Sequence, residues 1–155
     1  MSANRRDLIA MSEEERFAFI EEQKSLQVAC MGRDGWPHLT TLWFAVVEKE
    51  IVFETYTRSQ KILNLQRDPR ITVLLEDGLT YETLRGVMIK GTASLVSEAN
   101  EVEKYAKFVM SRNHPEYDEE VFTQIAKEMS LKRTAVVVRA EEFISWDHTK
   151  LGGKY

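Results

Sequence analysis

Three β-rich runs follow one another in the first third of the chain with no helix between them, and this spacing limits the fold more than any other feature. The runs cover residues 26–31, 39–47 and 51–56. An Asp34-Gly35 pair, which is a strong hairpin signal, separates the first two runs. Parallel neighbours would each need a crossover connection of roughly a dozen residues or more, usually a helix. The spacing therefore predicts antiparallel strands and disfavours a doubly wound parallel sheet.

Helices are predicted both before and after these strands. Ser12 and Glu15 form a capping box, because each side chain can bond the backbone N–H at the other position. Pro69 ends another helix, since the residue before a proline avoids the helical conformation. Further along, apolar residues recur at helical spacing on both sides of a break. Helices are therefore predicted from Ser12 to near Gln23, over 59–67, and on either side of 113–115 within 97–129.

Strand patterning returns at residues 70–75, 87–96, 134–139 and 142–146. Many short antiparallel strands with helices inserted between them favour an α+β fold that is mainly β. The expected form is a closed barrel with peripheral helices, in which closure removes exposed strand edges. A length of 155 residues predicts a single domain over 1–155.

Composition excludes several kinds of site. The chain has 21 Lys+Arg against 25 Asp+Glu, a net charge of −4, so no nucleic-acid partner is expected. Cys30 is the only cysteine and there are three histidines, which excludes an internal disulfide and leaves no zinc-ligand spacing. Cys30 is predicted to be a small buried hydrophobe. Because neither a signal peptide nor a membrane-spanning run is present, we expect a reduced, cytoplasmic protein without a membrane partner.

The segment from Thr55 to Lys61 brings hydroxyl groups and two cations to the start of a helix. Ser59 is a natural N-cap, and the free N–H groups of the first turn favour an anion. Arg58 adds a planar guanidinium and Lys61 adds a point charge, which opposes the helix dipole unless something negative is bound. The pattern predicts a phosphate site, and a solvated turn is the alternative that spacing leaves open.

The remaining aromatic and basic residues are less specific. Trp43 is expected in the core rather than as a stacking platform, and His38 is expected on the surface. The cluster from Trp146 to Lys150 would lie at a barrel rim or against a partner chain, with a disordered tail over 147–155 as the alternative. The sequence contains no dinucleotide-binding fingerprint, P-loop or nucleophile elbow.

Four segments occur in an order typical of one known family. They are residues 37–44, 51–61, 64–70 with Val73, and 85–93. In this order they resemble the pyridoxamine 5′-phosphate oxidase-like family, and more narrowly its branch that uses a deazaflavin in place of FMN. The resemblance runs from about Glu14 to Trp146-Asp147, which is nearly the whole chain.

The resemblance implies an FMN-binding split barrel that forms a homodimer, with two cofactor sites at the subunit interface. It implies that the cofactor phosphate occupies the anion site and that the second strand runs along the ring. The phosphate residues would be Thr57, Ser59 and Lys61, assisted by Arg58 and with Tyr56 beside them. The ring residues would be Leu39, Thr40, Thr41 and Leu42. Two more residues, Trp146 and Lys150, would approach each ring from the partner subunit.

Two departures from the family pattern bear on specificity. The FMN-dependent oxidases usually carry Ser-Arg-Lys where this chain has Ser59-Gln60-Lys61, so Arg58 is expected to supply the missing cation from the other side. The Trp, Arg and His pattern by which pyridoxamine phosphate oxidases recognise their substrate is not reproduced around Trp146. Oxidation of vitamin B6 is therefore not expected.

The function implied by the resemblance is that of a reductase. A reduced 8-hydroxy-5-deazaflavin (coenzyme F-420) would give a hydride to a conjugated C=C or C=N bond of a small molecule. Tyr56 and Tyr81 are the candidate proton donors, and solvent is the alternative. Two other functions stay open. One is an FMN-dependent oxidase or flavin reductase, and the other is a non-catalytic protein that binds a flavin, a deazaflavin or a haem-like ligand.

Overall fold

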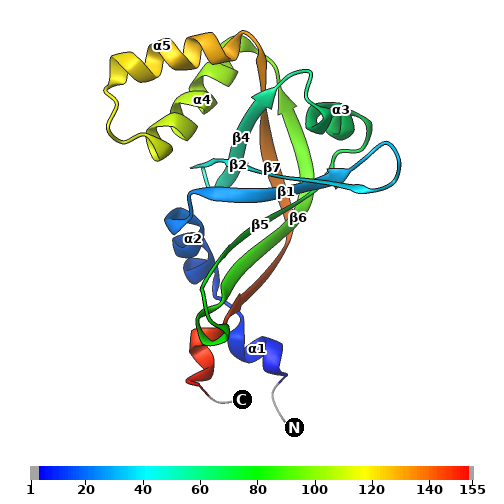
Figure 1. Cartoon of the computed structure of the whole chain (residues 1–155), viewed down its shortest axis with the longest axis vertical. Helices are drawn as coiled ribbons and strands as arrows, with labels where there is room; N and C mark the ends of the chain where they lie inside the picture. The colour runs from blue at the N-terminus through cyan, green and yellow to red at the C-terminus, as the bar shows by residue number, and fades with distance from the viewer. Residues whose placement is uncertain (1–3, 154–155) are drawn as a thin grey trace.

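Seven antiparallel strands pair into one curled sheet in the computed structural model, which describes residues 4–153 (Figure 1). The strands are β1 (Ser25–Met31), β2 (Pro37–Trp43), β3 (Ala45–Val47), β4 (Glu50–Tyr56), β5 (Arg70–Asp77), β6 (Arg85–Val96) and β7 (Arg133–Asp147). They pair in the order β2-β1-β5-β6-β7-β4-β3. The edge strands β2 and β3 do not pair with each other, so the closed barrel predicted from the strand pattern is corrected to a split barrel.

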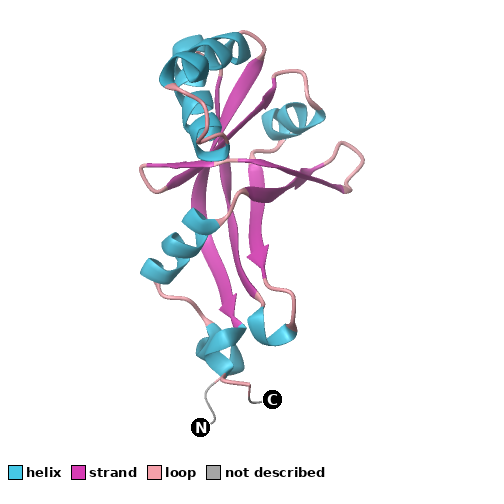
Figure 2. Cartoon of the chain, turned by 60° about the vertical axis from the view of Figure 1, so that its left-hand side comes forward, coloured by secondary structure: helices cyan, strands magenta, loops and turns pink. Residues whose placement is uncertain are grey.

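Helices surround this sheet, as Figure 2 shows. They are α1 (Arg5–Ile9), α2 (Glu13–Glu22), α3 (Gln60–Arg67), α4 (Ala99–Asn113) and α5 (Glu119–Ser130), with short 3-10 helices η1 (Tyr81–Thr83) and η2 (His148–Leu151). The antiparallel pair α4 and α5 packs against β3, β4 and β7, whereas α3 packs against β1. Within the described part of the chain, no helix is long and apolar enough to cross a membrane.

The core lies inside the curl of the sheet. Along β1, buried and half-buried residues alternate, so that Leu26, Val28 and Cys30 face inward. Phe44 and Phe53 are fully buried in the same cluster. The prediction that Cys30 is a small buried hydrophobe is confirmed, since it is 4% exposed.

Most predicted elements are present, but their limits differ where the sheet bends. The single strand predicted over 39–47 is wrong, because Phe44 turns into the core and separates β2 from β3. The two strands predicted over 134–146 form the one long strand β7, with a register shift opposite Lys90 and Gly91. The segment 147–155, for which disorder was the alternative, contains η2, and its last two residues lie outside the described range.

Candidate functional site

The start of α3 is held in place by the end of β4. Ser59 caps the helix, because its Oγ accepts a hydrogen bond from the backbone N–H of Ile62 at 3.4 Å. The N–H of Ser59 donates to the Tyr56 carbonyl at 2.8 Å. Thr57 shares a hydrogen bond between its Oγ1 and that of Thr134 on β7, 3.0 Å apart. The predicted N-cap is therefore confirmed, and the helix start is fixed against the sheet.

Lys61 is the unusual residue of this helix start. Its side chain is buried, with 5% of its surface exposed, and it makes no hydrogen bond or ion pair to any residue in 4–153. Burial lowers the pKa of Lys61, and the nearby Cys30 sulfur acts in the opposite direction. An ammonium group taken out of water without a partner is costly, so a bound anion would relieve that cost.

The next turn of α3 is locked by Asn64, which is fully buried. Its side-chain oxygen accepts hydrogen bonds from Gln60 at 2.8 Å and from Arg67 at 3.3 Å. Its side-chain nitrogen donates to the Cys30 Sγ at 3.7 Å. Arg67 also donates to the Met31 carbonyl at 2.7 Å, so α3 is bonded directly to the end of β1.

A groove of about 620 Å³ separates the turn between β1 and β2 from α3. Its lining residues are Gly32, Arg33, Asp34, Trp36, Pro37, His38, Gln60 and Asn64. On β2, two buried polar atoms, His38 Nδ1 and Thr40 Oγ1, have no hydrogen-bond partner. His38 lines the groove, and because buried polar atoms are normally paired, its unpaired Nδ1 fits a ligand with a complementary polar group.

The strand β2 presents the residues predicted to lie along a ring. It is an edge strand, so one side of its backbone has no partner strand within residues 4–153. Leu39 and Thr41 are exposed on one face, while Thr40 and Leu42 are half-buried on the other. The structure therefore brings the β2 residues and the start of α3 to the same end of the molecule, where Figure 1 shows α3 beside the β1–β2 turn.

The C-terminal candidates lie at the opposite end of the same chain. Trp146 is the second-last residue of β7, close to η2, and Lys150 lies in η2 itself. The ammonium of Lys150 donates to Glu15 Oε2 at 2.7 Å and to the Ala10 carbonyl at 2.8 Å. Neither residue is brought to the α3 groove within one chain.

The two tyrosines predicted as proton donors are also separated. Tyr81 is in η1 at the C-terminal end of the molecule, where its ring contacts His148 with centroids 4.4 Å apart. Tyr56 is 53% exposed and lies next to the anion site. Within one chain, Tyr56 is therefore close to the candidates at the start of α3, whereas Tyr81 is close to the C-terminal candidates Trp146 and Lys150.

The contact between Arg133 and Tyr56 was not predicted from the sequence. The Arg133 guanidinium lies over the Tyr56 ring, with its carbon 4.6 Å from the ring centroid. Arg133 also forms an ion pair with Glu54, whose side chain is only 7% exposed. No local pattern links these residues, because Arg133 and Glu54 are far apart in the sequence and meet only through the pairing of β4 with β7.

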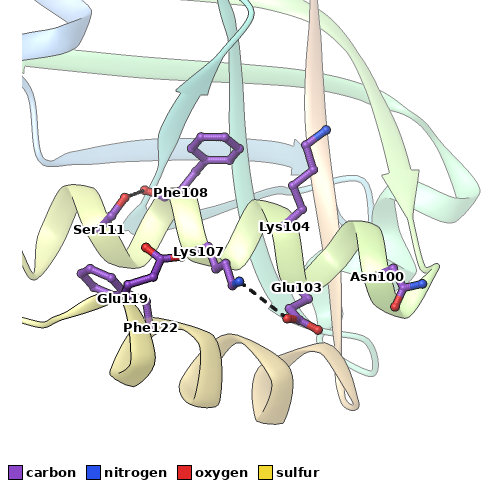
Figure 3. A pocket seen from close by; sticks show the side chains of 8 residues that line it. All are labelled: Asn100, Glu103, Lys104, Lys107, Phe108, Ser111, Glu119 and Phe122. Atoms are coloured by element: carbon purple, nitrogen blue, oxygen red, sulfur yellow. Dashed lines mark hydrogen bonds and ion pairs between the residues drawn. The ribbon is translucent and has the colours of Figure 1, made fainter.

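Other concave surfaces bring fewer chemically useful side chains close together. The hollow between α4 and α5, of about 420 Å³, is shown in Figure 3. There Lys107 is 3.9 Å from Glu103, whereas Phe108 and Lys104 point away from α5. Among the described residues, no group of three or more His, Cys, Asp or Glu side chains is placed to hold a metal ion. The α3 groove with Lys61 is thus the strongest candidate site.

Comparisons with known proteins bear on the family and the fold of the chain. A family model described as pyridoxamine 5′-phosphate oxidase matches residues 12–147. A pyridoxine/pyridoxamine 5′-phosphate oxidase of Kineococcus radiotolerans is 38% identical over 88 residues, which is 57% of this chain. That match covers 38% of the length of the Kineococcus protein.

Solved structures resemble the whole chain. The conserved hypothetical protein Rv2991 from Mycobacterium tuberculosis is 41% identical, with a TM-score of 0.91, over 99% of this chain and 95% of its own. An F420 reductase has a TM-score of 0.65 at 20% identity, over 81% of this chain and 93% of its own. The haem storage protein HutZ from Vibrio cholerae has a TM-score of 0.63 at 17% identity, over 86% of this chain and 94% of its own. The last two likenesses show the fold alone.

Proposed function

The chain belongs to the pyridoxamine 5′-phosphate oxidase family, and we propose that it is an oxidoreductase that reduces a conjugated C=C or C=N bond of a small molecule with a reduced deazaflavin. The observation that carries the proposal is the buried residue Lys61, whose side chain has no hydrogen-bond or ion-pair partner in residues 4–153. It lies in the first turn of the capped helix α3, next in sequence to Gln60, which lines the groove. This arrangement suits the phosphate of a flavin-type cofactor. The resemblance of the four ordered segments to the deazaflavin-using branch favours a deazaflavin over FMN, and Gln60 stands where FMN-dependent oxidases usually carry Arg.

The residues present fit a phosphate-bearing cofactor with a planar ring. Thr57, Ser59 and Lys61 would hold the phosphate, with Arg58 exposed beside them. The unpaired Thr40 Oγ1 and the open backbone edge of β2 offer hydrogen bonds to a ring laid along that strand. When bound, the reduced deazaflavin supplies the hydride.

The chain's own residues orient the reactants and manage a proton. The curled sheet holds β2 and α3 in fixed relation, because Asn64 and Arg67 bond α3 to β1. Tyr56, whose ring lies under the Arg133 guanidinium, would give a proton from its hydroxyl to the reduced product, with solvent as the alternative donor. No nucleophile is required, since the cofactor carries the difficult chemistry.

We further propose that the protein is a homodimer. The outer face of the sheet carries apolar side chains that alternate with the buried core along β1 and β5. The residues of this face include Ala29, Met31, Leu39, Leu74, Met88 and Ile144. A second copy packed there would bury them and could bring its Trp146 to the first copy's ring. Lys150 could reach the ring only if its pair with Glu15 opened.

Titration of the purified protein with coenzyme F-420 and with FMN, followed by intrinsic tryptophan fluorescence, tests the cofactor. We expect F-420 to bind more tightly, and Lys61→Ala to weaken binding about ten- to a hundredfold, because a charged hydrogen-bond donor is lost. Lys104→Ala, an exposed lysine on α4, is the matched control. Tight FMN binding without F-420 binding would overturn the deazaflavin, and unchanged affinity in Lys61→Ala would place the phosphate elsewhere.

Activity and mass complete the test. With reduced F-420, the protein should reduce at least one acceptor in a panel of quinones, unsaturated lactones and tetrapyrroles. Light scattering should give twice the 18.0 kDa mass of one chain. Binding without turnover of any acceptor would instead support the alternative of a non-catalytic carrier, and a monomeric mass would rule out the shared site. The family match also leaves an FMN-dependent oxidase or flavin reductase as the second candidate, which the FMN titration separates.

A further inference from the structure

The thiol of Cys30 lies next to two polar side chains of the candidate site. The amide nitrogen of the fully buried Asn64 donates a hydrogen bond to Cys30 Sγ at 3.7 Å. In the register of β1 and β2, Cys30 is directly opposite His38. Residues opposite each other in an antiparallel pair point to the same face, with Cβ atoms roughly 4.5–5.5 Å apart. The thiol therefore has both an amide donor and an imidazole beside it.

The imidazole of His38 has a free nitrogen on this inner face of β2. His38 was expected on the surface but is half-buried, and its Nδ1 has no hydrogen-bond partner in residues 4–153. In the tautomer that is protonated at Nε2, Nδ1 is an acceptor. The other face of β2 carries Trp43, which is 45% exposed, so its predicted place in the core is wrong. His38 is thus a proton acceptor on the same face as the Cys30 thiol.

Lys61 is on the side of α3 that packs against β1. Residues three apart in a helix are neighbours, so Lys61 and Asn64 share the buried face of α3. Lys61 is 5% exposed and makes no hydrogen bond or ion pair to any residue in 4–153. Burial lowers the pKa of Lys61, and the negative charge of a Cys30 thiolate acts against this shift. A cation near a thiol favours the thiolate in return.

The α3 groove brings solvent close to this thiol. His38 and Asn64, the two residues beside Cys30, both line the groove of about 620 Å³. Cys30 itself is only 4% exposed. A reagent near the size of water can therefore approach Sγ from the groove, whereas a bulky thiol reagent is excluded by the packing around it.

We propose that Cys30 is a modification site for hydrogen peroxide and that the resulting sulfenate pairs with Lys61. The Cys30 thiolate attacks one peroxide oxygen, so that an S–O bond forms while the O–O bond breaks. The sulfur loses two electrons, and the departing oxygen is reduced to water. The thiol proton passes to His38 and then to the departing hydroxide. The sulfenic acid loses its own proton to solvent, and its oxygen accepts a hydrogen bond from Lys61.

This modification would change the candidate site, because Lys61 is also proposed to hold the cofactor phosphate. A sulfenate paired with Lys61 takes the place of that phosphate, so oxidation of Cys30 would weaken cofactor binding. The oxidation itself goes beyond the proposed function and does not depend on it. Only its effect on the cofactor rests on the proposed function.

Trapping of the sulfenic acid in cofactor-free protein tests the modification. The folded protein is exposed to hydrogen peroxide at pH 7, and catalase then removes the peroxide. The chain is next unfolded in urea that contains dimedone, so trapping does not depend on access. Cys30 is the only cysteine, so every dimedone adduct found by mass spectrometry is on Cys30.

The reference is the same chain treated with peroxide while it is unfolded in urea. We expect oxidation in the folded protein to be at least about threefold faster, because a nearby cation and a proton acceptor favour the thiolate. A slower rate in the folded protein would overturn the proposal, since folding protects a thiol that is merely buried.

Lys61→Met and His38→Gln should each slow this oxidation about three- to tenfold, because one removes the cation and the other the proton acceptor. Lys104→Met, at an exposed position on α4, is the matched control and should leave the rate unchanged. The melting temperature of each variant shows that it is folded under the conditions used. An unchanged rate in both variants would mean that neither residue activates the thiol.

Titration with F-420 measures the consequence for the site. Peroxide-treated wild type should bind F-420 about ten- to a hundredfold more weakly, and dithiothreitol should restore the affinity. Cys30→Ser keeps a hydrogen-bond acceptor for Asn64 and should bind F-420 like untreated wild type, with or without peroxide. A Cys30 adduct with unchanged F-420 affinity would overturn the pairing with Lys61. If the wild type binds no F-420, the proposed function fails, and the dimedone rates still decide whether Cys30 is the modification site.

Discussion

The indole ring of Trp146 on β7 lies directly over Gly86, its register partner on β6. A Cβ atom at position 86 would collide with Cζ2, Cε2 and Cη2 of the indole. Gly86 is therefore required by close approach and not by its backbone angles. It lets Trp146 lie against the outer face of the sheet, where a partner subunit is proposed to pack.

Gly86→Ala should displace Trp146 and destabilise the fold. Forcing a methyl group into a filled contact costs about 1–3 kcal/mol, measured as the free energy of unfolding in urea. Cofactor affinity should fall as well, since Trp146 is proposed to approach the ring in the dimer.

The Trp146→Ala background provides the control for this substitution. With the indole removed, Gly86→Ala should cost less than about 1 kcal/mol, because nothing remains for the Cβ to meet. An equal cost in both backgrounds would show that the loss comes from the β6 backbone and not from the Trp146 contact.

Lys61→Met should stabilise the cofactor-free protein while abolishing its response to cofactor. Burial of Lys61 disfavours its charged form, and methionine fills a similar volume without a charge. We expect the melting temperature at pH 7 to rise by roughly 2–4 °C, which corresponds to about 1 kcal/mol. Added F-420 should then leave the melting temperature of the variant unchanged.

The difference in stability between the wild type and Lys61→Met should depend on pH, because the pKa of Lys61 is lowered. Burial brings that pKa below the unfolded value of 10.5, so the cost is fully present below the folded pKa and is relieved as the pH rises through it. The advantage of Lys61→Met should therefore be smaller at pH 10 than at pH 7. Lys104→Met, at an exposed position, should show no such trend; a trend of equal size there would remove burial as the cause.

Features set by residues that are close together in the sequence were predicted, whereas features set by contacts between distant segments were not. The Ser12 capping box, the Ser59 N-cap and the break before α5 were predicted because each is set by residues within a few positions of one another. The exposure of Trp43 was not, because an apolar residue in a strand has the same pattern whether its face is covered or not. Whether the Trp43 face of the strand is covered depends on where α4 and α5 pack.

The candidate site divides in the same way. The hydroxyls and cations from Thr57 to Lys61 were predicted, because they are consecutive and begin a helix. The burial of Lys61 and the Arg133 guanidinium over Tyr56 were not, since they arise from strand pairing between distant segments. Family resemblance supplied residue roles that spacing alone left open.

Asp77→Asn should make the free energy of unfolding depend less on pH in the acid range. Burial acts to raise the pKa of Asp77, but hydrogen bonds from Arg85 at 2.7 and 3.0 Å and from Gln23 at 3.0 Å outweigh it, so the pKa is lowered below 3.8. A lowered pKa contributes stability above the unfolded value, and that contribution is lost as the pH falls through the folded pKa. The free energy of unfolding of the wild type should exceed that of the variant by about 0.5–1.5 kcal/mol at pH 7 and by much less near pH 2.

Urea unfolding at both pH values measures this change. Glu14→Asn, at an exposed position on α2, is the control, and its difference from wild type should stay small at each pH. A deficit in Asp77→Asn that persists unchanged at pH 2 would mean that the carboxylate charge is not what stabilises the Arg85 contact.

Arg112→Lys should loosen the attachment of α4 to the end of α2. The Nη2 of Arg112 donates to three backbone carbonyls, at 3.0 Å to Ile20, 2.7 Å to Glu21 and 2.7 Å to Gln23. The guanidinium also lies over the Phe44 ring, with its carbon 4.6 Å from the centroid. Lysine has the charge but not the planar fork, so it cannot reproduce these bonds together.

We expect Arg112→Lys to cost about 1.5–3 kcal/mol in the free energy of unfolding, because hydrogen bonds from a charged donor to backbone carbonyls are lost. Ser111→Ala, the exposed neighbour on α4, should cost less than about 0.5 kcal/mol. Amide hydrogen exchange should show faster opening at the end of α2 in Arg112→Lys, because the carbonyls of Ile20 and Glu21 lose their partner. If the lysine variant were as stable as wild type, charge alone would suffice and the three-carbonyl contact would not be what joins α4 to α2.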